Sequence, residues 1–137
     1  PEAFFQVLHK YDDASYLMSA SIQPTHGPEY RRTDGLVEGH AYSLIKVAEV
    51  EEQKLLLLRN PWGNDCEWNG KWSDKSDMWD SHPTVKEALR PSFQDDGLFW
   101  MDFEDFCQTW DMVNVCLKSM RSGEDLSVHL QPAVYVA

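Results

Sequence analysis

A histidine and an asparagine stand where two neighbouring strands could bring their side chains together. His40 begins an alternating stretch over residues 39–50, and Asn60 directly follows an apolar run over residues 54–59. Because the strands of an antiparallel hairpin place paired residues side by side, this arrangement predicts that His40 and Asn60 meet. A single histidine that enters a strand is more often a hydrogen-bonded structural residue, so it is the pair that indicates function.

The chemistry that such a pair serves is that of a cysteine protease. There an imidazole stabilises a thiolate as an ion pair and then protonates the leaving amine, while an amide oxygen on the other ring nitrogen fixes the ring's orientation. Trp62, two residues after Asn60, could cover the His40–Asn60 hydrogen bond and exclude competing water. The spacing is equally compatible with a tryptophan that only packs in the core.

The cysteines of the chain are badly placed to be the nucleophile. In papain-like enzymes the cysteine precedes the histidine and asparagine by roughly 130–150 residues. Here only 39 residues precede His40, and Cys66, Cys107 and Cys116 all follow it. Their odd number and the lack of a CxxC spacing argue against a disulfide framework and a structural zinc site. We expect an absent preceding subdomain to supply the thiolate and the rest of the oxyanion hole, and this chain, which starts at Pro1, to be inactive alone.

The composition is that of an acidic globular protein. The 137 residues carry a formal net charge of -11, which argues against a nucleic-acid partner because phosphate recognition needs clustered basic residues. Apolar residues make up 42% of the chain and aromatic residues 12%, so one folded domain is expected. No apolar run approaches the roughly 18–20 residues of a membrane span, and no signal peptide is recognisable. A soluble, cytoplasmic protein is therefore predicted.

Apolar periodicity predicts an α+β domain with a mainly antiparallel sheet and two or three short helices. The predicted strands are residues 16–22, 39–50, 54–59, 97–103 and 112–117, with a hairpin turn at 50–53. A long loop over residues 60–81 should be ordered by its tryptophans. Residues 1–118 would form the domain, residues 119–126 a linker, and residues 127–137 a strand without a partner at the start of a following segment.

Three local patterns predict the helices. The first helix covers residues 1–11. The second begins at a capping box over Thr84–Glu87 and ends before Pro91. Asp102 is suited to cap the third helix. The apolar faces expected for the first and third helices are Phe4, Val7, Leu8 and Tyr11, and Phe103, Phe106, Cys107 and Trp110. Cys107 and Cys116 are both expected in the core.

Four segments in order make the chain similar to the second protease subdomain of calpains. They are EGHAYS at 38–43, RNPWG at 59–63, EWNGKWSD at 67–74 and DGLFWM at 96–101. The resemblance covers residues 1–118 and implies a papain-like right-hand β subdomain of an intracellular cysteine endopeptidase that cleaves proteins. It also implies that the nucleophile lies on the preceding subdomain, and that Trp62 flanks the catalytic pair and helps to gate assembly of the cleft.

Calpains also bind calcium in each protease subdomain. The resemblance places one site among Glu67, Asp74, Asp96, the backbone near Gln94 and a carboxylate at position 98. This chain has Leu98 there, and its segment before Glu67 is one residue longer than in the family, although Asp65 could substitute as a ligand. Calcium is therefore expected to bind weakly, and solvated loop acids remain an alternative.

Two other classes of function stay open at this point. The domain could be a non-catalytic interaction or regulatory module, if the preceding subdomain lacks its cysteine. It could also be a calcium-responsive binding domain, although such a domain would need neither His40 nor Asn60. The sequence upstream of Pro1 and an activity assay on the full core would separate these possibilities.

Overall fold

The computed structural model describes residues 1–63, 66–119 and 134–135, the last two by their backbone alone. Four helices are present in these ranges: α1 (Glu2–Asp13), α2 (Met78–Ser81), α3 (Pro83–Leu89) and α4 (Phe103–Thr109). The strands are β1 (Tyr16–Ser21), β2 (Ala41–Val50), β3 (Gln53–Arg59), β4 (Leu98–Asp102), β5 (Met112–Ser119) and β6 (Val134–Tyr135).

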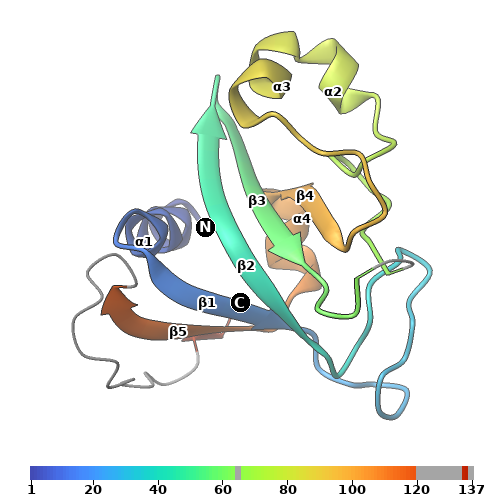
Figure 1. Cartoon of the computed structure of the whole chain (residues 1–137). Helices are drawn as coiled ribbons and strands as arrows, with labels where there is room; N and C mark the ends of the chain where they lie inside the picture. The colour runs from blue at the N-terminus through green and yellow to red at the C-terminus, as the bar shows by residue number, and fades with distance from the viewer. Residues whose placement is uncertain (64–65, 120–133, 136–137) are drawn as a thin grey trace.

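The strands form one twisted antiparallel sheet in the order β4-β3-β2-β1-β5-β6 (Figure 1). The predicted α+β class with a mainly antiparallel sheet is therefore confirmed. The β2–β3 connection is the expected tight turn, in which Glu51 and Glu52 have φ of +48° and +65°. Two successive positive φ angles match the right-handed twist of the two strands they join. This hairpin also sets the geometry of the site described below.

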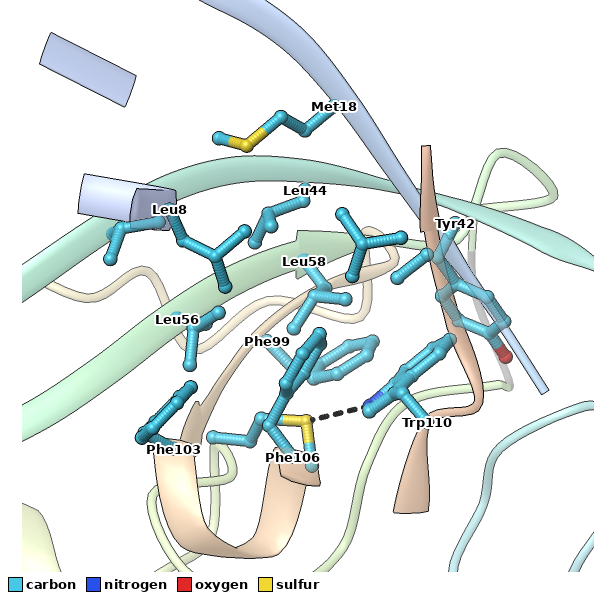
Figure 2. Packing of buried hydrophobic residues seen from close by; sticks show 14 of the residues in the cluster. Leu8, Met18, Tyr42, Leu44, Leu56, Leu58, Phe99, Phe103, Phe106 and Trp110 are labelled. Carbon is cyan, nitrogen blue, oxygen red and sulfur yellow. Dashed lines mark hydrogen bonds between the residues drawn. The ribbon is translucent and has the colours of Figure 1, made fainter. Parts of the chain in front are cut away.

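One face of the sheet is covered by α1 and α4, which enclose the larger core (Figure 2). In that view Leu8 from α1 and Phe103 and Phe106 from α4 meet Leu44, Leu56 and other residues of the strands. The indole of Trp110 closes this core, and its N–H donates to the sulfur of Met101 at 3.1 Å. Burial alternates over Ala41–Leu44, whereas β3 and β4 bury consecutive residues such as Leu55 and Leu56, because residues of these strands pack in two cores. At Ile45 the β2–β3 register shifts, and the bulge leaves the side chain exposed.

A second core explains why the long connection after β3 is ordered. Trp72, Trp79 and Trp100 pack with Val85 and Leu55 on the other face of the sheet, beside the β2–β3 hairpin. The indole N–H of Trp79 donates to the backbone oxygens of Trp72 and Ser73 at 3.2 and 3.0 Å. The predicted anchoring by tryptophans is confirmed for the described residues, but the end of the segment forms the helix α2.

Several local predictions need correction. Helix α1 buries Phe5 in place of Val7, which is 40% exposed, while Leu8 stays buried and Phe4 and Tyr11 pack against the core as predicted. The Phe5 ring meets the Phe103 ring edge-on. The Thr84 capping box is not formed: α3 begins one residue earlier, at Pro83, whose restricted φ suits a first helical position. Cys107 and Cys116 are only half-buried: Cys107 packs against the edge of the larger core, whereas Cys116 alternates to the other face of β5 from the core residue Val115.

The C-terminal strand was predicted to lack a partner, and this was wrong for the described residues. Val134 and Tyr135 pair with Val113 and Met112 of β5. The predicted linker lies outside the described residues from position 120 onward. In contrast, Asp102 caps α4 as predicted, with its carboxylate accepting from the Glu104 N–H at 2.8 Å. Across the described ranges, every helix is too short or too polar to cross a bilayer.

Candidate active site

The start of β2 and the end of β3 bring His40 and Asn60 together. In the hairpin register Ser43 pairs with Arg59, so His40 and Asn60 both lie just beyond the last paired residues at the same end of the ladder. The imidazole Nε2 is 2.9 Å from the Asn60 Oδ1. The side chains thus meet as the strand pattern predicted.

The amide of Asn60 is fully buried and its orientation is fixed on both sides. Its Nδ2 donates to the Cys66 carbonyl at 3.3 Å, while its Oδ1 accepts from the Trp62 N–H at 3.0 Å. Since an amide oxygen can only accept, the proton in the His40–Asn60 hydrogen bond belongs to Nε2. The other ring nitrogen, Nδ1, is therefore left for chemistry outside this pair.

Two aromatic rings hold the His40 imidazole in place. The Trp62 ring lies 4.3 Å from the imidazole between centroids, and the Tyr42 ring meets it edge-on at 5.3 Å. Only 10% of the His40 side chain is exposed, whereas Trp62 is 49% exposed. Trp62 therefore lies at the surface beside the His40–Asn60 pair.

The loop that leads into His40 is tied down by a buried carboxylate. Glu38 accepts from the backbone N–H and the hydroxyl of Thr25, at 3.0 and 2.7 Å. These hydrogen bonds lower the pKa of Glu38 to about 2. Tyr42 binds the same loop, because its hydroxyl accepts from the Val37 N–H, and burial raises the Tyr42 pKa to about 12.

Comparison with known proteins identifies the family. The family model for calpain family cysteine proteases matches residues 1–117. The chain belongs to the calpain family of cysteine proteases. It is 37% identical over 126 residues to Calpain-B of Drosophila melanogaster, a match that covers 85% of this chain and 14% of that relative. It is 38% identical over 136 residues to Calpain-9 of Rattus norvegicus, covering 94% of this chain and 20% of the relative.

The match extends to plants and is always to a small part of a longer protein. Calpain-type cysteine protease DEK1 of Zea mays is 38% identical over 111 residues, which are 81% of this chain and 5% of the relative. The chain thus spans a fifth or less of the length of these three curated relatives. The family is one of hydrolases, the cysteine proteases.

The acidic residues of this calpain-family chain gather on the far side of Asn60. The Glu67 carboxylate accepts from the backbone N–H groups of Asp96 and Gly97, at 3.1 and 2.8 Å. Asp74 lies beside Glu67, and burial together with that negative charge raises the Asp74 pKa to about 7. Together with Phe93 and Asp95, Glu67 and Asp74 line a pocket of about 510 Å³.

These acids do not form a preassembled metal site. The Asp96 carboxylate accepts from the Leu98 N–H at 3.0 Å, and position 98 contributes only an apolar side chain. Among the described residues, no three acidic, histidine or cysteine side chains converge as metal ligands. Asp65 lies outside the described residues. The expected weak binding of calcium therefore stays a prediction.

Sequence reasoning missed three residues that the fold places around His40. Glu29 lies 4.0 Å from the imidazole Nδ1, Glu38 ties down the loop, and Tyr42 packs against the ring. Tyr42 could have been found, since it stands two residues after His40 on the same strand and so projects from the same face. The roles of Glu29 and Glu38 depend on the path of the loop over residues 23–38, which has no periodic signal.

Proposed function

We propose that this chain supplies the histidine and the asparagine of a calpain-type cysteine endopeptidase. The 2.9 Å contact between His40 Nε2 and Asn60 Oδ1 carries the proposal. It places a neutral acceptor on one ring nitrogen and leaves Nδ1 available, which is the arrangement that a thiolate–imidazolium pair requires. A module that only binds a partner would need neither the buried amide nor the aromatic enclosure of the imidazole.

His40 would move protons between the nucleophile, the leaving group and water. In acylation a cysteine thiolate attacks the peptide carbonyl carbon, and the imidazolium Nδ1–H protonates the departing amine. In deacylation the neutral Nδ1 takes a proton from water as the water attacks the thioester carbon. The C–S bond then breaks, the acid product leaves, and the released thiolate again faces an imidazolium. Asn60 keeps Nε2 protonated throughout, so that Nδ1 alone exchanges protons.

The nucleophile of this enzyme would lie in a preceding subdomain. Cys66 is buried on the Asn60 side of the site, where its backbone carbonyl is already bound by the amide. Burial raises the pKa of the Cys107 thiol, which opposes formation of a thiolate. Cys116 lies within β5, away from the end of the hairpin that carries His40. The chain alone should therefore be catalytically silent.

The same proposal includes protein substrates and an intracellular location. A free thiolate persists in the reducing interior of a cell, and Cys66, Cys107 and Cys116 are all free thiols here. Calcium would be a weak ligand of the loop near Glu67, Asp74 and Asp96, because position 98 supplies no oxygen. No step of the reaction above depends on that ion.

The test is to reconstitute a complete core from this chain and a calpain-type cysteine-bearing subdomain. We expect cleavage of a general peptide substrate by the combination and none by either part. His40→Ala should lower kcat by about 10²–10⁴-fold, the range of general acid–base catalysis. His82→Ala is the matched control, because that ring contacts Trp72 in the second core. Thiol-dependent cleavage by the chain alone would overturn the proposal.

A further inference from the structure

The free nitrogen of His40 faces a glutamate that the reaction above does not use. Glu29 Oε1 lies 4.0 Å from Nδ1, and the Glu29 side chain is 55% exposed. The contact is longer than a hydrogen bond, so the carboxylate stands beside Nδ1 without occupying its donor position. A charged group therefore borders the place where a leaving amine would receive its proton.

The backbone of Glu29 is fixed relative to His40. Its φ of +54° is unusual for a residue other than glycine. The Glu29 nitrogen approaches Gly39 so closely that a Cβ there would lie only 3.3 Å from it. The next residue is held as well, because the Tyr30 carbonyl accepts from the Glu38 N–H at 2.8 Å and the Tyr30 ring stacks on His26. These contacts anchor the loop on both sides of the Glu29 side chain.

The guanidinium of Arg32, in the same loop, forms ion pairs with acids other than Glu29. It binds the Asp34 carboxylate at 3.0 Å and lies 4.0 Å from Glu38. Glu38 is buried, whereas 55% of the Glu29 side chain is exposed, so the acids that bind Arg32 do not include Glu29 among the contacts of this loop. Glu29 thus presents negative charge to the same solvent that a substrate must cross to reach His40.

We propose that Glu29 is a specificity-determining residue, which selects substrates with a basic side chain directly after the scissile bond. The inference rests on the proposed function, in which Nδ1 protonates the leaving amine. The residue that carries this amine must then pass beside Nδ1, within reach of a carboxylate 4.0 Å away. A lysine or arginine there would gain a partly exposed ion pair, and a glutamate would be repelled.

The experiment uses the complete core and three peptides that differ only in the residue after the scissile bond, which is Lys, Gln or Glu. We expect kcat/KM for the Lys peptide to exceed that for the Glu peptide by about fivefold, as for one exposed ion pair. The ratio should fall toward one in high salt. Glu29→Gln should bring it near one at any salt, and Glu29→Lys should reverse it.

A matched control separates a local contact from a general charge effect. Glu52→Gln removes the same charge from the β2–β3 turn, at the opposite end of β3 from Asn60, and should leave the ratio unchanged. An unchanged ratio in Glu29→Gln would overturn the inference alone. An equal loss for all three peptides would also overturn it, since Glu29 would then act on His40 and not on the substrate. Absence of cleavage by the native core would instead overturn the proposed function, and this inference with it.

Discussion

Glu38 and Asp74 are shielded carboxyl groups on opposite sides of the His40–Asn60 pair, and their surroundings are opposites. Glu38 receives hydrogen bonds from Thr25, which lower its pKa to about 2. Asp74 faces Glu67 and is partly desolvated, which raises its pKa to about 7. Hydrogen-bond donors stabilise the ionised Glu38, whereas desolvation and the neighbouring carboxylates favour the protonated form of Asp74 or a bound cation.

The difference shows on which side of the His40–Asn60 pair a carboxylate has its stabilising partners within this chain. In the loop before His40, the Glu38 carboxylate has its partners within the chain, which are Thr25, His26 and Arg32. Backbone groups join the acidic side to the His40–Asn60 pair: Gly97 donates its N–H to Glu67, and its carbonyl accepts from the Asn60 N–H at 2.9 Å. The carbonyl of Cys66, next to Glu67, also accepts from the Asn60 amide. A change in the acidic loop can therefore reach Asn60 through backbone alone.

The largest effect is expected from Gly97→Ala, which should disturb the backbone hydrogen bonds of Gly97 to Glu67 and Asn60. A Cβ at this position would lie 2.7 Å from the Asn60 carbonyl oxygen and 2.8 Å from that of Gly63, at a φ of +86°. Both contacts are with backbone, so the substitution should cost about 3 kcal/mol of unfolding free energy in urea.

The control for this substitution is Gly27→Ala. Gly27 has a similar φ of +92° but nothing within 4 Å of the added Cβ, so it isolates the backbone cost, about 1 kcal/mol. Equal losses in the two variants would show that the Gly97 contact with Asn60 is relaxed at no cost.

Asn60→Ala tests the catalytic side by itself. Removal of the buried amide leaves the Trp62 N–H and the Cys66 carbonyl without this partner, which should cost about 1–3 kcal/mol. It should also release Nε2 of His40, so that NMR shows a changed balance of the two imidazole tautomers. Asn69→Ala is the control, because Asn69 is exposed and binds only the Thr33 carbonyl with its amide nitrogen. Unchanged His40 signals would contradict the 2.9 Å contact.

The contact between His40 and Asn60 could be predicted from the sequence because it depends on local rules. Alternation over 39–50, an apolar run and a tight turn determine a hairpin, and a hairpin determines which ends meet. The Asp102 cap was predictable for the same reason, since it involves a side chain and a backbone N–H two residues away. The Thr84 cap failed because Pro83, one residue earlier, offers a better first helical position.

The contacts that could not be predicted are made by loops, whose sequences show no hydrophobic periodicity. Glu29 and Glu38 have their neighbours because the loop over residues 23–38 folds back on itself, and its residues show no alternation. The pKa of Asp74 depends on Glu67 and Asp96, which approach it only after β4 has paired with β3.

Leu98→Glu tests whether the acidic side lacks a calcium ligand at position 98. Calcium prefers six to eight oxygen ligands, and affinity increases with the number of carboxylates. We expect the native chain to bind no tighter than ~10⁻⁴ M by calorimetry, and Leu98→Glu to bind about tenfold tighter. Leu98→Gln adds an oxygen without a charge and separates the two contributions. Micromolar binding by the native chain would show that Leu98 is no handicap, and no binding by Leu98→Glu would show that these acids do not share one ion.

The smallest effect expected is a difference in pH dependence between Asp74→Asn and Glu38→Gln. The pKa of Asp74 rises from 3.8 to about 7 on folding, so its contribution to stability is complete below pH 4 and is lost as the pH rises toward 7. Asp74→Asn should therefore match the native chain near pH 4 and exceed its stability at pH 7, by at most about 1 kcal/mol because the carboxyl is partly solvated.

The pKa of Glu38 falls from 4.5 to about 2, so its contribution is complete above pH 4.5 and is lost as the pH falls toward 2. Glu38→Gln should accordingly be less stable than the native chain at pH 7, and the difference should vanish toward pH 2. Thermal unfolding across this range would measure both, and parallel curves for the two variants would mean that the two carboxyl groups do not have opposite surroundings.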